Sequence, residues 1–137
     1  MSEDARIAAI LRRVRTVAVV GASNNPERPS HDVMRFLQAK GFSVIPVNPG
    51  LAGRRLLGEP VLARLEDVDP KPDMVDVFRA PDQAGAVVDA AAALGVGVAW
   101  LQIGVVDEAA TARARAAGVE VVMDRCPKIE WARLGLD

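Results

Sequence analysis

The amino-acid sequence predicts an α/β protein, a three-layer sandwich around a mainly parallel sheet of five strands. Two observations lead to this prediction. Short apolar runs alternate with helical patterns about five times along the chain, which is the order expected when helices connect parallel strands. The first of these runs, residues 17–20, contains no polar residue, so both faces of that strand are expected to be covered by helices.

The individual elements follow from local patterns. Strands are expected where short apolar runs end at glycine, proline or a polar turn, at residues 17–20, 42–47, 74–78, 98–103 and 119–123. Helices are expected where apolar residues recur at helical spacing, at residues 4–14, 31–40, 81–94, 108–117 and 128–136. Residues 60–65 are expected to form a brief strand or a turn, and as a strand they would be the sixth of the sheet.

Single residues mark the ends of these elements. Ser30 and Asp107 have side chains suited to cap the helices that follow them, and Pro81 is suited to the first position of its helix. Pro46 has no backbone N–H group, so the second strand is expected to lie at an edge of the sheet or to leave the sheet at this residue.

Length and composition indicate one domain over residues 1–137. Hydrophobic residues make up 50% of the chain, yet no apolar run reaches the roughly 20 residues of a membrane helix. The first residues resemble no targeting signal, so a cytoplasmic protein is expected. The net charge of −1 gives no general attraction to nucleic acid. With one histidine and one cysteine, Cys126, the chain has neither an internal disulfide nor a zinc site, which favours an organic ligand over a metal.

The stretch from residue 16 to residue 30 carries the strongest indication of a ligand. Gly21 ends the first strand, and a polar loop leads from it into the next helix. Backbone N–H groups at the start of a helix are unsatisfied and lie at the positive end of its dipole, so this loop predicts a phosphate site. In open parallel sheets such ligands bind at the carboxyl ends of the strands. The alternative is a tight turn that binds nothing.

The loop departs from the fingerprint of nicotinamide cofactors. It reads Gly-Ala-Ser-Asn-Asn-Pro rather than G-x-G-x-x-G, and no acidic residue lies between Asp32 and Glu59 to bind the ribose hydroxyls, so NAD is disfavoured. Arg54 and Arg55, which follow the second strand, are suited to a ribose phosphate. NADP and coenzyme A (CoA) both carry such a phosphate, so these arginines do not choose between them.

Five segments carry a resemblance to a known family. They are, in order, VVGASNNPERPS, VIPVNPG, VDVFRAP, WLQIGV and VVMDRC, and the resemblance extends over residues 17–134. They resemble the small stand-alone CoA-binding proteins related to the N-terminal domain of the succinyl-CoA synthetase alpha subunit. This resemblance implies a Rossmann-like fold, with CoA lying across the carboxyl edge of the sheet.

Carried over by position, the resemblance assigns the parts of CoA to residues of this chain. The glycine loop and its phosphate contacts correspond to Gly21, Ala22, Ser23, Asn24, Asn25, Pro26 and Arg28. The adenine and ribose region corresponds to Val47, Asn48 and Pro49, and the loop after the third strand to Phe78, Arg79 and Pro81. The pantetheine region corresponds to Leu101, Gln102 and Ile103. The synthetase has a lysine where this chain has Leu51, so a charged contact there falls to Arg54 or Arg55.

The sequence favours a binding protein over an enzyme. The synthetase uses a phosphorylated histidine in a second domain, whereas His31, the only histidine here, is interpreted as a helix-terminus residue. No Ser/His/Asp set and no Walker lysine is recognised. We therefore expect a protein that binds CoA or acyl-CoA as a sensor, or as a carrier that presents it to a protein partner. The alternatives are an NADP-binding oxidoreductase and an interaction module without a ligand; acyl preference and oligomeric state stay open.

Cys126 follows the last strand, where its thiol could lie near the pantetheine end of a bound CoA. The favoured interpretation is a small buried core residue. A mixed disulfide between Cys126 and CoA is the alternative.

Overall fold

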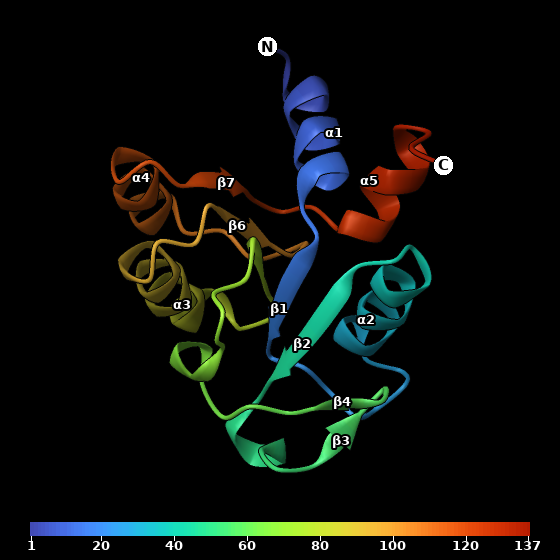
Figure 1. Ribbon diagram of the computed structural model, residues 1–137. Helices are drawn as coiled ribbons and strands as arrows, with labels where there is room; N and C mark the ends of the chain where they lie inside the picture. The colour runs from blue at the N-terminus through green and yellow to red at the C-terminus, as the bar shows by residue number, and fades with distance from the viewer.

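The computed structural model describes residues 1–137 and has a five-stranded sheet at its centre (Figure 1). Neighbouring strands are all parallel, in the order β2-β1-β5-β6-β7. The strands are β1 (Thr16–Val20), β2 (Ser43–Val47), β5 (Met74–Val77), β6 (Val98–Leu101) and β7 (Glu120–Val122). The helices are α1 (Glu3–Arg13), α2 (Pro29–Ala39), α3 (Pro81–Ala93), α4 (Glu108–Ala116) and α5 (Pro127–Arg133). The predicted α/β sandwich with a five-stranded, Rossmann-like sheet is confirmed.

Helices cover both faces of the sheet, as Figure 1 shows. On one face, apolar residues of α1 and α2 pack with Val17 and Val19 of β1, and Trp131 of α5 packs against the same cluster. On the other face, small residues of α3 and α4 pack with Val75 and Val77 of β5. Side chains alternate between the two faces along each strand, so the central strands are apolar throughout. No helix has both the length and the apolar character needed to cross a membrane.

The order of the strands reverses beside β1. From β1 the chain passes through α2 to β2 on one side, whereas β5, β6 and β7 follow one another on the other side. The carboxyl ends of β1 and β5 therefore form the topological switch point, where open α/β sheets bind their ligands. The polar loop between β1 and α2 begins at this point.

The segment after β2, expected to be a brief strand or a turn, does not add a sixth strand to the main sheet. It forms a small antiparallel hairpin outside the main sheet, β3 (Arg55–Leu56) with β4 (Glu59–Pro60), and then a single bridge between Leu62 and Val47. In that bridge Leu62 donates its N–H to the carbonyl of Pro46. The carbonyl of Leu62 accepts in return from the N–H of Asn48, but Pro46 has no N–H, so the pairing does not extend back along β2. As expected from Pro46, β2 lies at an edge of the sheet.

The helix-end residues predicted from the sequence are confirmed at two positions and wrong at one. Pro81 begins α3, and the Asp107 side chain accepts a 2.9 Å hydrogen bond from the N–H of Ala110 in the first turn of α4. Ser30, however, does not cap α2: the helix begins at Pro29, and Ser30 is buried in its first turn. Pro29 has the backbone angle of a helix and lacks an N–H, so it takes the first helical position, and the helix begins two residues earlier than predicted.

Candidate functional site

Gly21 brings the ends of β1 and β5 together. Its φ angle is +95°, and a Cβ atom at this position would collide with the backbone carbonyl of Phe78. Phe78 in turn donates its N–H to the carbonyl of Val20 over 2.8 Å. Only glycine combines this backbone conformation with so close an approach. At the switch point, the backbone at the end of β1 therefore packs directly against the backbone at the end of β5.

The end of β2 is tied to the same place by Asn48. Its amide Nδ2 donates to the carbonyl of Ala22 over 2.7 Å, and its Oδ1 accepts from the N–H of Gly50 over 2.8 Å. The carbonyl of Val47 accepts from the N–H groups of Gly21 and Ala22 at 3.0 and 3.3 Å. The Asn48 side chain thus connects the backbone that follows β2 to the backbone that follows β1.

The loop between β1 and α2 is held by its own polar side chains. Ser23 Oγ accepts from the N–H of Asn25 over 3.1 Å, and Asn25 Oδ1 accepts from the N–H of Glu27 over 3.0 Å. Asn24, Asn25 and Pro26 are exposed at its surface. Arg28 follows as the residue before α2; its guanidinium is exposed and makes no hydrogen bond or ion pair within the chain. A preformed loop beside an unpaired guanidinium suits a phosphate.

A groove of about 900 Å³ opens beside this loop. It lies between the start of α2, the end of β6 and α5, and it brings together Pro26, Arg28, Gln102, Ile103, Cys126 and Ile129. Gln102 and Cys126 are buried, whereas Ile103 and Ile129 are 55% and 52% exposed. Buried Gln102 Oε1 has no hydrogen-bond partner. The groove therefore has aliphatic walls and one unused acceptor.

Lys128 and Asp32 join the two helices that line this groove. Lys128 Nζ of α5 and Asp32 Oδ2 of α2 are 2.9 Å apart, and both residues line the groove. This ion pair neutralises a carboxylate in the first turn of α2, so less negative charge opposes an anion there.

A second, smaller hollow of about 260 Å³ lies on the other side of the switch point. It is lined by Gly21, Val47, Pro49 and Arg79, and also by Arg64 from the segment that follows the hairpin. Arg64 was missed in the sequence, because a single arginine in a loop gives no local indication of what lies beside it. Two arginines thus border one hollow next to the glycine turn, an arrangement that suits a second phosphate.

The structure leaves several of the sequence-assigned residues outside both hollows. Arg54 and Arg55 are exposed near the hairpin, where Arg55 Nη1 donates to the carbonyl of Gly58 over 3.0 Å. Pro81 is exposed at the start of α3. Leu101 belongs to the core under α3 and α4, because it points to the face opposite Gln102. Phe78 is half-buried and packs against the core under α1 and α2.

Two buried titratable groups lie on the core face that α1 and α2 cover. Asp76 is fully buried in β5, in register with Val19 and Trp100, and neither of its carboxyl oxygens has a partner. Burial raises the pKa of Asp76 well above its usual value. His31 lies in the first turn of α2, as its helix-terminus assignment predicted, and its buried Nδ1 has no partner. Asp76 was missed in the sequence, because one acid in an apolar run is also typical of a half-exposed strand.

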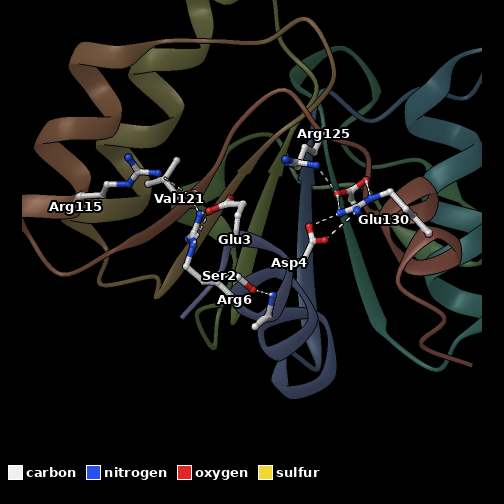
Figure 2. Close-up of polar contacts among 10 residues, drawn as sticks. Ser2, Glu3, Asp4, Arg6, Arg115, Val121, Arg125 and Glu130 are labelled. Atoms are coloured by element: carbon white, nitrogen blue, oxygen red, sulfur yellow. Dashed lines mark hydrogen bonds and ion pairs between the residues drawn. The ribbon is translucent and has the colours of Figure 1, made fainter.

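The groove wall formed by α5 is anchored to the N-terminal helix, as Figure 2 shows for Arg125, Glu130 and Asp4. Glu130 Oε1 lies 2.7 Å from Arg125 Nη1 and 2.9 Å from Arg133 Nη2, and the same Arg133 nitrogen lies 2.6 Å from Asp4 Oδ1 of α1. Burial alone would raise the pKa of Glu130, but hydrogen bonds from Arg133 and Arg125 hold it below its usual value. The network fixes α5, and with it Cys126 and Ile129.

Known proteins match this chain over most of its length. A protein-family model described as a CoA binding domain matches residues 15–132. The protein YneT of Bacillus subtilis strain 168 is 37% identical over 128 residues, which are 93% of each chain. The structure of cell-free ID.343 from Thermus thermophilus has a TM-score of 0.91 and 38% identity, covering 97% of this chain and 99% of that one.

A larger enzyme contains a related domain. The dinucleotide-forming acetyl-coenzyme A synthetase 1 of Ca. Korarchaeum cryptofilum, in complex with phosphate and ADP, has a TM-score of 0.70 at 26% identity. The match covers 83% of this chain but 27% of the synthetase, so one part of the larger enzyme shares this fold. Together with the family match over most of the chain, these relatives confirm the resemblance that the five sequence segments predicted. The chain belongs to the CoA-binding domain family.

Proposed function

We propose that this protein binds CoA or acyl-CoA at the carboxyl edge of its sheet and acts as a sensor or carrier without catalysis of its own. The observation that carries the proposal is the convergence of the glycine turn, Arg28 and the groove at the switch point, in a chain whose family is defined by CoA binding. Each part of this arrangement suits one part of the ligand.

The phosphate groups suit the charged side of the site. The pyrophosphate lies against the β1–α2 loop and the start of α2, where Arg28 offers an unpaired guanidinium. The ribose and its phosphate lie in the smaller hollow, between Arg79 and Arg64. Arginine forms bidentate contacts with phosphate, so each of these side chains can orient the ligand as well as attract it.

The pantetheine arm suits the groove. Its methylene and methyl groups lie between Ile103 and Ile129, and an amide N–H of the arm donates to the unpartnered Oε1 of Gln102. A groove of about 900 Å³ is within the usual size of small-molecule sites, roughly 300–1,000 Å³. NADP has no corresponding arm, so this groove favours CoA.

Titration calorimetry with CoA, acetyl-CoA, NAD and NADP tests the proposal. We expect heat with CoA or acetyl-CoA and none with NAD or NADP. In the variants Arg28→Ala and Arg79→Ala we expect CoA to bind about tenfold more weakly or worse, since a hydrogen bond to a charged group contributes about 1.5–3 kcal/mol.

The matched control is Arg12→Ala, which removes an exposed arginine at the opposite end of the molecule, in the last turn of α1. Its affinity should equal that of the wild type. Folded, ligand-free protein that gives no heat with CoA or acetyl-CoA would contradict the proposal.

A further inference from the structure

Cys126 is the only thiol of the chain, and it lies in the groove assigned above to the pantetheine arm. It is the residue before α5 and lines the groove together with Gln102, Ile103 and Ile129. Cys126 is 6% exposed and belongs to the core cluster under α1 and α2, as the sequence favoured, and it also lines the groove. A molecule bound in the groove would therefore lie beside Cys126.

Gln102 indicates independently what kind of molecule that is. Its side chain is 8% exposed, it lines the groove, and its Oε1 accepts no hydrogen bond from the chain. Buried polar atoms are normally paired, so this unpaired acceptor favours an occupant that brings an N–H or O–H donor. The exposed aliphatic side chains of Ile103 and Ile129 beside it favour contact with hydrocarbon. An occupant with amide N–H groups along an aliphatic chain meets both demands, and the pantetheine arm ends in a thiol.

We propose that Cys126 is a thiol–disulfide exchange site at which CoA becomes linked covalently to the protein. This inference rests on the proposed CoA binding and adds a modification that binding alone does not require. The oxidised reactant is CoA disulfide, the dimer of CoA joined through its two sulfurs.

The exchange step balances without another oxidant. Cys126 loses its proton to water, and its thiolate attacks one sulfur of CoA disulfide. A bond forms between Cys126 Sγ and that sulfur, the sulfur–sulfur bond of the reactant breaks, and the second CoA leaves as a thiolate that takes a proton from water. Cys126 is thereby oxidised to a mixed disulfide, and one CoA is released in the reduced form.

The single cysteine also determines how the linkage ends. No second cysteine exists in the chain to attack the mixed disulfide and expel CoA. The adduct therefore persists until an external thiol reduces it. In this way oxidation converts reversible occupancy of the groove into covalent occupancy.

Intact-mass spectrometry after incubation with CoA disulfide tests the inference. We expect the wild type to gain the mass of one CoA less two hydrogens, and dithiothreitol to remove this mass. The reaction should be at least about tenfold faster than with oxidised glutathione, because binding of the nucleotide part raises the local concentration of the disulfide. Acetyl-CoA, which has no free thiol, should slow the reaction by occupying the same groove.

The matched variant is Cys126→Ser, which changes one atom and leaves a residue suited to the position before a helix. It should give no adduct, and Cys126→Ala serves in its place if circular dichroism shows that the serine variant is unfolded. CoA binding is measured on the wild type by calorimetry in the presence of a reductant. Wild-type protein that binds CoA but forms no adduct, or that reacts equally fast with oxidised glutathione, overturns the inference and leaves the proposed function standing. Absence of both binding and adduct overturns the two together.

Discussion

At the scale of single residues, Gly21 and Asp76 show two different constraints near the site. Gly21 is required by backbone geometry, because its φ angle of +95° and the nearby carbonyl of Phe78 both exclude a side chain. Asp76 is a cost to stability, because its carboxyl group is fully buried without a partner. Each constraint leads to a measurable effect on stability.

Gly21→Ala is expected to destabilise the protein by about 2–4 kcal/mol, because the unfavourable φ angle and the collision with Phe78 act together. Gly53→Ala is the matched control, since Gly53 has a φ angle of +85° but no atom within 4 Å of an added Cβ. It should cost about 1 kcal/mol, from the backbone conformation alone. Urea unfolding measures both values, and equal losses in the two variants would show that the close approach to Phe78 has no energetic importance.

Asp76→Asn is expected to stabilise the protein increasingly as pH rises. The pKa of Asp76 is raised by burial in the folded protein and lies near 3.8 in the unfolded chain. Between these two values the folded state holds a proton that the unfolded state has lost, so stability falls with rising pH by up to about 1.4 kcal/mol per pH unit. The variant lacks this slope, so its advantage should be smallest near pH 3, where Asp76 is protonated in both states, and should grow as pH rises.

Asp73→Asn serves as the control, because the change in stability that it causes should depend on pH in the opposite direction. Hydrogen bonds from the backbone N–H groups of Arg15 and Thr16 lower the pKa of Asp73, although partial burial opposes them. Its carboxylate therefore stabilises the fold above its unfolded pKa and loses this effect as pH falls. Urea unfolding between pH 3 and pH 8 distinguishes the two variants; a constant difference between Asp76→Asn and the wild type would show that Asp76 does not titrate as described.

At the scale of elements, α5 decides the shape of the groove although it has only seven residues. A helix this short is marginal by itself, so contacts with other elements must hold it in place. Trp131 packs edge-on against Phe36 of α2 at a centroid distance of 6.0 Å, and Glu130 and Arg133 connect α5 to α1. Ion pairs thus hold one side of α5 and aromatic packing the other.

Glu130→Gln is expected to destabilise the protein by about 1–3 kcal/mol at pH 7, because a buried carboxylate that serves two arginines is replaced by a neutral amide. The pKa of Glu130 is lowered in the folded state, so its contribution exists above the usual value of 4.5 and is lost as pH falls through the folded value. The difference between variant and wild type should therefore shrink as pH falls below 4.5.

Glu120→Gln is the matched control, since Glu120 pairs with Arg13 at the protein surface. Its effect should stay below about 1 kcal/mol, as is usual for exposed ion pairs. Thermal unfolding of both variants measures the contrast. Equal losses at Glu130 and Glu120 would contradict the special role of the α5 network.

At the scale of the whole molecule, the site exists because separate strands end at one edge of the sheet. The loop after β1, Asn48 after β2, Phe78 after β5 and Gln102 after β6 belong to four strand ends that are far apart in sequence and close in space. Folding also carries Arg64 beside Arg79, whereas the hairpin carries Arg54 and Arg55 to neither hollow. We therefore propose that Arg64, rather than Arg54 or Arg55, contacts the ribose phosphate of CoA.

Arg64→Ala is therefore expected to weaken CoA binding by about tenfold, the loss expected for one charge-assisted contact. Arg54→Ala, which removes an exposed arginine near the hairpin, should leave the affinity unchanged. Calorimetry with CoA and with dephospho-CoA separates the phosphate contact from general attraction, because dephospho-CoA should bind equally to the wild type and to Arg64→Ala. A loss of CoA affinity in Arg54→Ala but not in Arg64→Ala would assign the ribose-phosphate contact to Arg54 instead.

Local patterns were enough to predict the layer architecture, the strand positions to within a residue or two, and the strand-end loops that border the groove and the smaller hollow. Apolar periodicity, glycine and proline are short-range signals, and they report directly on strands, helices and turns. Local patterns could not predict the order of the strands or the groove that Cys126 lines. They also could not predict that Arg64 and Arg79 line the same hollow, or that Asp76 is buried without a hydrogen-bond partner. Each depends on which distant segments become neighbours, and that is decided when the two apolar faces of the sheet are covered by helices.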